Sequence, residues 1–332
     1  MRVLDRLDEL YAIGEGPGAN RVGGSDGEQR AHDLAAGWMR QAGLKVEVDP
    51  AGNLIGRTGD ARIWTGSHLD SVPQGGKFDG ALGVVAGIEA VERAGVGAVV
   101  AFRDEERGCV GSRDAVERGA LPGTFLEVHV EQGPVLARQD APLGIVTSIT
   151  AMAHGERVFD GVAGHAGTTP MAGRSDALCA AAEYVLRVRD AAAEIDGAVA
   201  TVGRIEAEPD AANVIPGRVR VTVDARAPDL DRLGALLRVL ELDVQPMLAP
   251  VRMAEGPRGA LRAEVERLGL PVVELPSGAG HDAAVLAAAG VPTGMLFVRS
   301  LNGGVSHSPE EESSSGDVEL AVDVLAGALR AL

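Results

Sequence analysis

The sequence is poor in the features that mark secreted and membrane proteins. Cysteine occurs only twice in 332 residues, at Cys109 and Cys179, which excludes a disulfide framework and indicates a reducing, cytoplasmic compartment. No apolar run approaches the length of a membrane-spanning helix. The N-terminal stretch MRVLDRLDELYAIGEG is charged at helical spacing and lacks the uninterrupted apolar segment of a signal peptide. We therefore expect no membrane partner.

Lysine and aromatic residues are also scarce, and the net charge is strongly negative. Lys45 and Lys77 are the only lysines, aromatic residues make up 3% of the chain, and the formal net charge is -17. A chain this acidic repels nucleic-acid phosphates and anionic membrane surfaces, and it offers few rings on which bases could stack. The composition argues against a nucleic-acid partner and leaves room for buried carboxylates that bind cations.

The length and the order of apolar patterns predict an α/β protein of more than one domain. A chain of 332 residues is long for a single compact core. Helical spacing over 27–44 and 80–95, with short apolar runs over 61–67, 96–102 and 125–130, favours a three-layer α/β domain with a mixed sheet. In such domains, functional groups follow the carboxyl ends of strands.

The pattern changes near residue 149 and returns near residue 257. Between them we expect a strand, a helix, two strands, a helix and one more strand near 249–253, which is typical of a small α+β domain of the split βαβ, ferredoxin-like kind. The predicted catalytic domain, residues 1–148 and 257–332, is therefore interrupted by an inserted domain, residues 149–256.

Imidazole and carboxylate groups gather in four places outside the insert. They are His68 with Asp70 and Asp79, the pair Glu105 and Glu106, His129, and His307. Such ligands suit zinc, cobalt or manganese, and one carboxylate can bridge two cations that share a water. Asp79 suits the bridge, since glycines at 75, 76 and 80 let the backbone pass close to the ions. Asp70 is placed to hold the second ring nitrogen of His68.

Each of these groups also has an ordinary structural explanation. A histidine and an aspartate in a glycine-rich loop are typical of a capped turn, and adjacent glutamates after a strand are usually solvated. His129, inside an apolar run, can be a core residue. Four such groups, all at predicted strand ends or in the loops that follow, favour a metal site. His32 and His154 belong to no motif and are expected at the surface.

Seven segments, in this order along the chain, resemble a known family. They are GSHLDSVPQGGKFDGALGVVAGIEA, DEE, EVHVEQGPVLA, GHAGTTPMAGRSDAL, ANVIPG, SGAGHDA and VSHSPEE. The chain resembles the two-metal amidohydrolases that include N-carbamoyl-L-amino acid hydrolases, β-ureidopropionases and allantoate amidohydrolases, within the aminoacylase and carboxypeptidase G superfamily. The resemblance implies hydrolysis of a C–N bond in a small anionic ureido acid. It also implies two divalent metal ions per subunit, zinc first, with manganese or cobalt as alternatives.

The resemblance also implies roles for individual residues of the metal centre. One metal would be held by His68, Asp79 and His129, and the other by Asp79, Glu106 and His307. Glu105 would be the general base that moves a proton from the water to the leaving nitrogen. Asp70 would also belong to the catalytic residues, by holding the ring of His68.

Further roles fall partly in the inserted domain. The resemblance implies that His165 reaches the active site of the other subunit of a homodimer, formed through the inserted domain, and steadies the oxyanion. The implied substrate-binding residues are Gln132, His165, Asn213, Arg226, Gly278 and Gly280. The role of His281, in the same motif as the two glycines, stays open. Arg226 would pair with the substrate α-carboxylate, although it also suits an outward strand residue paired with Asp224.

Departures from the family pattern leave the substrate open. Asp104 stands where asparagine is usual, and the segment between Glu106 and His129, which helps to shape the pocket, is shorter than usual. Hydrolysis of N-acyl amino acids or dipeptides is therefore an alternative. A non-catalytic metabolite-binding homologue is disfavoured, because all five ligands and the base are present.

Overall fold

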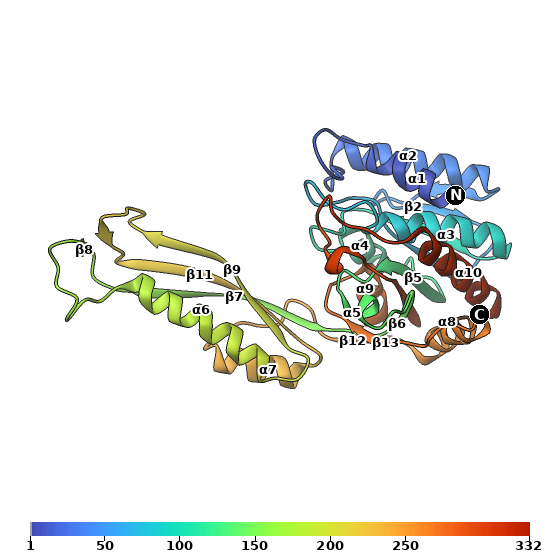
Figure 1. Cartoon of the computed structure of the whole chain (residues 1–332). Coiled ribbons are helices and arrows are strands. Elements are labelled where there is room, and N and C mark those ends of the chain that lie inside the picture. The colour runs from blue at the N-terminus through green and yellow to red at the C-terminus, as the bar shows by residue number, and fades with distance from the viewer. Residues whose placement is uncertain (1) are drawn as a thin grey trace. The chain divides into compact units, whose positions relative to one another are not determined.

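The computed structural model describes residues 2–332 and divides into two compact units (Figure 1). The larger unit runs up to Ile149 and resumes at Arg252, and the smaller unit is Thr150–Val251. The sequence analysis places these boundaries after residues 148 and 256. The second boundary of the structure therefore lies earlier, at residue 251.

The larger unit is built on one nine-stranded mixed sheet with the order β1-β2-β4-β3-β5-β14-β6-β12 and with β13 beside β6. Its strands are β1 (Lys45–Val48), β2 (Leu54–Arg57), β3 (Ile63–His68), β4 (Ala98–Phe102), β5 (Thr124–Val130), β6 (Leu143–Ile149), β12 (Val251–Arg252), β13 (Glu274–Ser277) and β14 (Thr293–Val298). The central run β4-β3-β5-β14 is parallel, whereas the pairs β1–β2, β2–β4 and β14–β6 are antiparallel. The predicted α/β class with a mixed sheet is confirmed.

Helices cover both faces of this sheet. They are α1 (Arg2–Tyr11), α2 (Asp26–Gln41), α3 (Ala81–Ala94), α4 (Val110–Glu117), α5 (Val135–Arg138), α8 (Glu255–Arg267), α9 (Asp282–Ala288) and α10 (Ser315–Ala331), with a short 3₁₀ turn at Asn302–Gly304. The main apolar core lies between the sheet and α1, α2, α3, α8 and α10, and includes Val128 and Val130 of β5. Because side chains alternate along a strand, His129 points to the other face, where its ring meets His281 at the start of α9.

The smaller unit combines a three-stranded antiparallel sheet, order β7-β11-β9, with two helices. Its elements are β7 (Ala151–Asp160), β8 (Gly164–His165), α6 (Ala177–Ala193), β9 (Val199–Glu208), β10 (Val214–Ile215), β11 (Arg218–Ala227) and α7 (Leu230–Val239). One apolar core joins β7 and β11 to α6 and α7. β8 and β10 form a separate two-stranded ribbon.

Two strands differ from the sequence analysis. No strand is assigned there to 143–149, where β6 lies, and the strand expected near 249–253 as the last of the insert is wrong. Only Val251 and Arg252 are extended there, and they pair at the edge of the large sheet. Pro250 has no N–H to donate, which limits the length of this strand.

Two observations bear on composition. Cys109 and Cys179 are free thiols. Among residues 2–332, none of the helices is both long enough and apolar enough to cross a membrane.

Candidate metal centre

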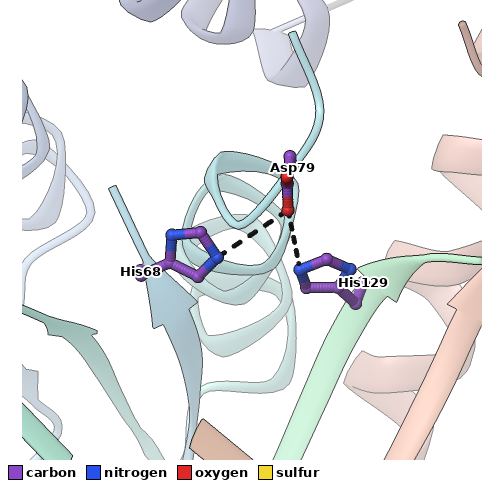
Figure 2. Close-up of side chains that lie close together, drawn as sticks. All are labelled: His68, Asp79 and His129. Carbon is purple, nitrogen blue, oxygen red and sulfur yellow. Dashed lines mark ion pairs between the residues drawn. The ribbon is translucent and has the colours of Figure 1, made fainter. Parts of the chain in front are cut away.

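The metal-binding candidates of the larger unit come together at one edge of its sheet. His68 is the last residue of β3, and His129 lies one residue before the end of β5. The two strands are parallel neighbours, so their carboxyl ends meet at the same edge. Asp79 reaches this edge from the turn that leads into α3. Figure 2 shows its carboxylate pointing between the two imidazole rings.

The two carboxylate oxygens of Asp79 face different groups of side chains. Oδ1 lies 3.2 Å from Nε2 of His129 and 3.8 Å from Nε2 of His68. Oδ2 lies 3.1 Å from Nε2 of His307, which in turn is 3.7 Å from Oε2 of Glu106. Potential ligand atoms within each of the two sets, His68–Asp79–His129 and Asp79–Glu106–His307, lie within 4.8 Å of one another. Asp79 is thus the only residue common to both sets and has one oxygen for each.

Hydrogen bonds to the far ring nitrogens give both buried histidines the tautomer that a metal ligand needs. Nδ1 of His129 donates to the carbonyl oxygen of Val130 at 3.0 Å, and Nδ1 of His68 lies 3.2 Å from Oδ1 of Asp70. In the neutral form of each ring, Nε2 then carries a lone pair toward Asp79, where a metal ion would displace the proton that the metal-free rings bind. In agreement, Nε2 of His129 accepts from the backbone N–H of Gly80 at 3.3 Å.

Asp70 also fixes the adjacent glutamates. Its Oδ1 and Oδ2 accept the backbone N–H groups of Glu105 and Glu106, each at 3.1 Å. The two glutamate side chains then diverge: Oε2 of Glu105 lies 3.7 Å from Nε2 of His68, while Glu106 faces His307. Oε1 of Glu106 is buried and makes no hydrogen bond among the described residues. An unpartnered buried carboxylate oxygen beside imidazole suits a bound cation.

The protonation of these groups reflects crowding of negative charge in a buried place. Burial is the main cause that raises the pKa of Glu105 to about 7, and Glu106 and Asp79 raise it further. Burial opposes a charged His129, but the carboxylate of Asp79 outweighs this effect and raises its pKa to about 9. Asp79 likewise raises the pKa of His307 to about 9. Protons thus occupy positions that suit divalent cations, and the donor set fits zinc, manganese or cobalt.

The glycines near Asp79 leave room for neighbouring side chains. A Cβ on Gly80 would lie 2.3 Å from the His68 ring, and one on Gly76 would lie 2.2 Å from the carboxyl carbon of Glu311. Gly80 also has a positive φ of 60°, which favours glycine. Gly76 and Gly80 therefore let the side chains of Glu311 and His68 lie directly against the backbone next to Asp79.

Two buried carboxylates that the sequence analysis did not single out support the centre. Glu127 accepts from the Ser67 hydroxyl at 2.6 Å and from the backbone N–H of Ala283 at 2.9 Å. It lies two residues before His129 on β5 and therefore on the same face, a signal that the sequence contained. The other is Glu311.

Glu127 also belongs to a third group of potential ligands, with His129 and His281. Both oxygens of Glu127 already accept hydrogen bonds, and Nε2 of His281 lies 2.9 Å from the Ser277 hydroxyl. The His281 ring packs against His129 with centroids 4.5 Å apart. These contacts indicate support for His129 rather than a further metal site.

Three residues outside the ligand sets are His32 on α2, His154 on β7 and Asp104 beside the glutamate pair. The surface position expected for His32 is wrong: the side chain is buried on α2, on the same face as Ala35 and Met39. His154 is exposed, as expected, and pairs with Asp224 at 2.7 Å. The extra negative charge of Asp104 is paired with Arg107 at 2.5 Å and 2.7 Å.

Among the predicted substrate residues of the larger unit, Gln132 contacts the centre. Nε2 of Gln132 donates to Oδ2 of Asp79 at 3.3 Å and to the Ser306 hydroxyl at 3.1 Å. Gly278 and Gly280 belong to the loop between β13 and α9, which leads to His281.

In the smaller unit the predicted residues fall into two places. His165 of β8 pairs with Val214, directly after Asn213, and the carbonyl oxygen of Asn213 accepts from Ala166 at 3.0 Å. Arg226 lies toward the other end of β11, opposite Met152. Its guanidinium donates two hydrogen bonds to Asp224, at 2.8 Å and 3.0 Å. This is the pairing expected if Arg226 is an outward-facing strand residue.

The comparison with known proteins agrees with this arrangement. Residues 64–331 match the model of Peptidase family M20/M25/M40. The chain belongs to this family. It is 37% identical to an N-carbamoyl-L-amino acid amidohydrolase of Geobacillus stearothermophilus, over 98% of this chain and 96% of that protein. It is also 32% identical to a probable allantoate deiminase of Oryza sativa, over 94% of this chain and 84% of that protein.

A solved structure gives the same result for the fold. An amidase of the hydantoinase/carbamoylase family from Burkholderia multivorans superposes with a TM-score of 0.86 and 30% identity, covering 99% of this chain and 97% of that one. The chain is therefore an amidohydrolase of a metal-dependent family, as the motif resemblance implies.

Proposed function

We propose that the protein hydrolyses a C–N bond of an N-carbamoyl amino acid or a related ureido acid, with two divalent metals and a glutamate base. The observation that carries the proposal is the carboxylate of Asp79, whose two oxygens face the two ligand sets. His68, Asp79 and His129 would hold one ion, and Asp79, Glu106 and His307 the other. When bound, the two ions polarise the substrate carbonyl and lower the pKa of the attacking water.

Glu105 is the proposed general base. It lies beside His68, with its Oε2 3.7 Å from Nε2 of that ring, and unlike Glu106 it belongs to neither ligand set, so its carboxylate remains available to accept a proton. It takes the proton of the attacking water and delivers it to the leaving nitrogen. The backbone bonds from Glu105 and Glu106 to Asp70 hold the base and the metal ligand in fixed and different directions.

His165 is proposed to stabilise the oxyanion. Its Nδ1 accepts backbone N–H groups from Gly167 at 3.0 Å and Thr168 at 3.3 Å. The proton of a neutral ring therefore lies on Nε2, which makes this exposed side chain a hydrogen-bond donor for developing negative charge.

The spacing within the smaller unit supports a homodimer. His165 and Asn213 lie next to the start of β11, whereas Arg226 lies near its end. The eight residue steps from Arg218 to Arg226 span roughly 26 Å of extended strand, further than a small ureido acid reaches. We therefore propose that one substrate meets His165 and Asn213 of one chain and Arg226 of another.

The relatives favour a ureido substrate. Proteins named as N-carbamoyl-L-amino acid amidohydrolases and allantoate deiminases match over nearly the whole chain. Arg226 is proposed to bind the substrate carboxylate with Asp224 behind it, and Gln132 to contact the substrate at the metal centre. Gly278 and Gly280 would contribute backbone N–H groups.

A panel of substrates tests the proposal. Protein loaded with zinc, manganese or cobalt is assayed with N-carbamoyl amino acids, allantoate, N-acyl amino acids and dipeptides. We expect ammonia release from at least one ureido acid, with kcat/KM at least about tenfold above every N-acyl compound. A preference for N-acyl amino acids or dipeptides would favour the alternative hydrolase, and no turnover at all would contradict the proposal.

A further inference from the structure

Glu311 is a buried carboxylate that joins two segments far apart in the sequence. Its side chain belongs to a residue that is 5% exposed. Oε1 accepts the backbone N–H groups of Phe78 at 2.7 Å and Asp79 at 2.9 Å, and Oε2 accepts the Ser306 hydroxyl at 2.6 Å. Hydrogen bonds to a buried charged acceptor are among the stronger ones in proteins. Both oxygens of Glu311 are therefore engaged, and neither is a candidate ligand.

The two segments that Glu311 joins carry two of the three proposed ligands of one metal. Asp79 provides the shared carboxylate, and Ser306 directly precedes His307. His307 differs from His68 and His129 because it lies in a loop, with a positive φ of 54° and a side chain that is 51% exposed. The strand ends that hold the other two histidines do not hold His307, so its position depends on local contacts.

Gln132 adds a second link between the same segments. Its Nε2 donates to both Oδ2 of Asp79 and the hydroxyl of Ser306. Ser306 thus accepts from Gln132 and donates to Glu311, which makes a continuous chain of hydrogen bonds from the side chain of Asp79 back to its own backbone.

The sequence also leaves space for this carboxylate. A Cβ on Gly76 would lie 2.2 Å from both Cδ and Oε1 of Glu311, and Gly76 does not have a positive φ. Alanine is therefore acceptable for the backbone at this position but not beside Glu311. Gly76→Ala offers a way to displace the carboxylate without changing its charge.

We propose that Glu311 is a positioning residue that ties the Asp79 turn to the His307 loop and thereby sets the metal affinity of the Asp79–Glu106–His307 site. This inference rests on the proposed function only in requiring that two metals bind. Loss of a supporting contact behind a ligand typically costs 10- to 100-fold in metal affinity. The site of His68 and His129, held by two strands, is expected to change much less.

The test measures each metal separately. Metal-free wild type, Glu311→Gln and Ser306→Ala are titrated with Zn²⁺ against a chromophoric chelator, with stoichiometry from elemental analysis. We expect both variants to bind one equivalent within about threefold of the wild type and the other about 10- to 100-fold less tightly. Gly76→Ala should behave like Glu311→Gln.

Matched controls lie in the same loop. Glu310→Gln removes an exposed carboxylate whose partner is Ser308, and Ser308→Ala removes that partner, so both should bind zinc as the wild type does. Wild-type affinity for both equivalents in Glu311→Gln and Ser306→Ala would overturn the inference. Equal weakening of both equivalents, with a lowered unfolding midpoint of the metal-free protein, would also overturn it, since it indicates a general loss of structure. A wild type that binds fewer than two zinc ions would overturn the proposed function and the inference together.

Discussion

At the scale of single residues, Glu105 and Glu106 are proposed to have different roles, one as general base and one as metal ligand. The backbone N–H groups of both residues donate to the carboxylate of Asp70. Their side chains nevertheless point in different directions, Glu105 toward His68 and Glu106 toward His307. Only the second is proposed to bind metal. The two residues should therefore respond differently to the same substitution.

Glu105→Gln should retain both metals and lose most activity. Glutamine keeps the size of the side chain but cannot accept the proton, so kcat should fall by at least about 100-fold. Elemental analysis of the purified variant checks the first part, and steady-state kinetics the second. Loss of metal together with activity would mean that the roles of the two glutamates are reversed.

Arg226→Lys should raise KM for substrates that carry a carboxylate. Lysine keeps the charge but not the two-pronged geometry, and it also loses the paired bonds to Asp224. We expect KM to rise at least about tenfold while kcat changes less. Unchanged KM across a panel of such substrates would show that Arg226 serves only its ion pair with Asp224.

The sequence predicts the residues of the metal centre better than those that support them. His68 and His129 lie at or near the ends of predicted strands and Asp79 lies in a glycine-rich loop, and the geometry brings the three together at one sheet edge. In the sequence, nothing distinguishes Glu311 from the other acidic residues of its loop, because its burial depends on contacts with residues 233 positions away. Its significance is a property of the folded chain.

At the scale of elements, local periodicity predicts most helices and strands but not their partners. The short apolar runs give β3, β4 and β5 within a few residues. The strand expected near 249–253 belongs to the large sheet and not to the insert, because two extended residues pair wherever an edge strand is available. In α2 the surface expectation for His32 overlooked its own spacing, since Ala35 and Met39 lie three and seven positions further on the same face.

Burial of His32 should make stability depend on pH. Burial, helped by Arg103, lowers its pKa to about 3 from an ordinary 6.5, and neither ring nitrogen has a hydrogen-bond partner among the described residues. Between about pH 6.5 and pH 3 the unfolded chain therefore binds a proton at this residue that the folded chain does not. The free energy of unfolding should decrease as the pH falls below about 6.5. This contribution is complete above that pH.

His32→Leu should remove this contribution. As the pH falls from 6 to 4, the free energy of unfolding of the variant minus that of the wild type should increase by about 1 kcal/mol for each unit of pH. Urea unfolding at several pH values measures the difference. Parallel pH dependences for the two proteins would show that His32 is protonated, or exposed, in the folded state.

At the scale of the whole molecule, each active site is proposed to contain residues from two chains. His165 pairs with Val214, before the start of β11, and Arg226 lies near the end of β11, so we expect the two to be too far apart in one chain to share a small substrate. The sequence motifs imply this dimer only through family resemblance, because an interface between subunits leaves no periodic signal. A complementation experiment tests it.

His165→Ala and Glu105→Gln proteins should each be nearly inactive, and mixed dimers should recover activity. One site of each mixed dimer then has both groups and the other has neither. Random mixing gives about half mixed dimers, so about a quarter of wild-type activity should return, well above a background lowered about 100-fold by loss of oxyanion stabilisation. No recovery in verified mixed dimers would place His165 in its own subunit's site or outside catalysis.

The central claim is that hydrolysis of a ureido acid depends on two metals bound around Asp79. Its most direct test is ammonia release from the best N-carbamoyl amino acid or allantoate by chelator-treated protein as zinc or manganese is added back in known amounts. We expect no activity without metal, full activity at two equivalents per chain, and one amino acid or other amine product for each ureido bond cleaved. Full activity that persists in the metal-free protein, or that is complete at one equivalent, would contradict the account.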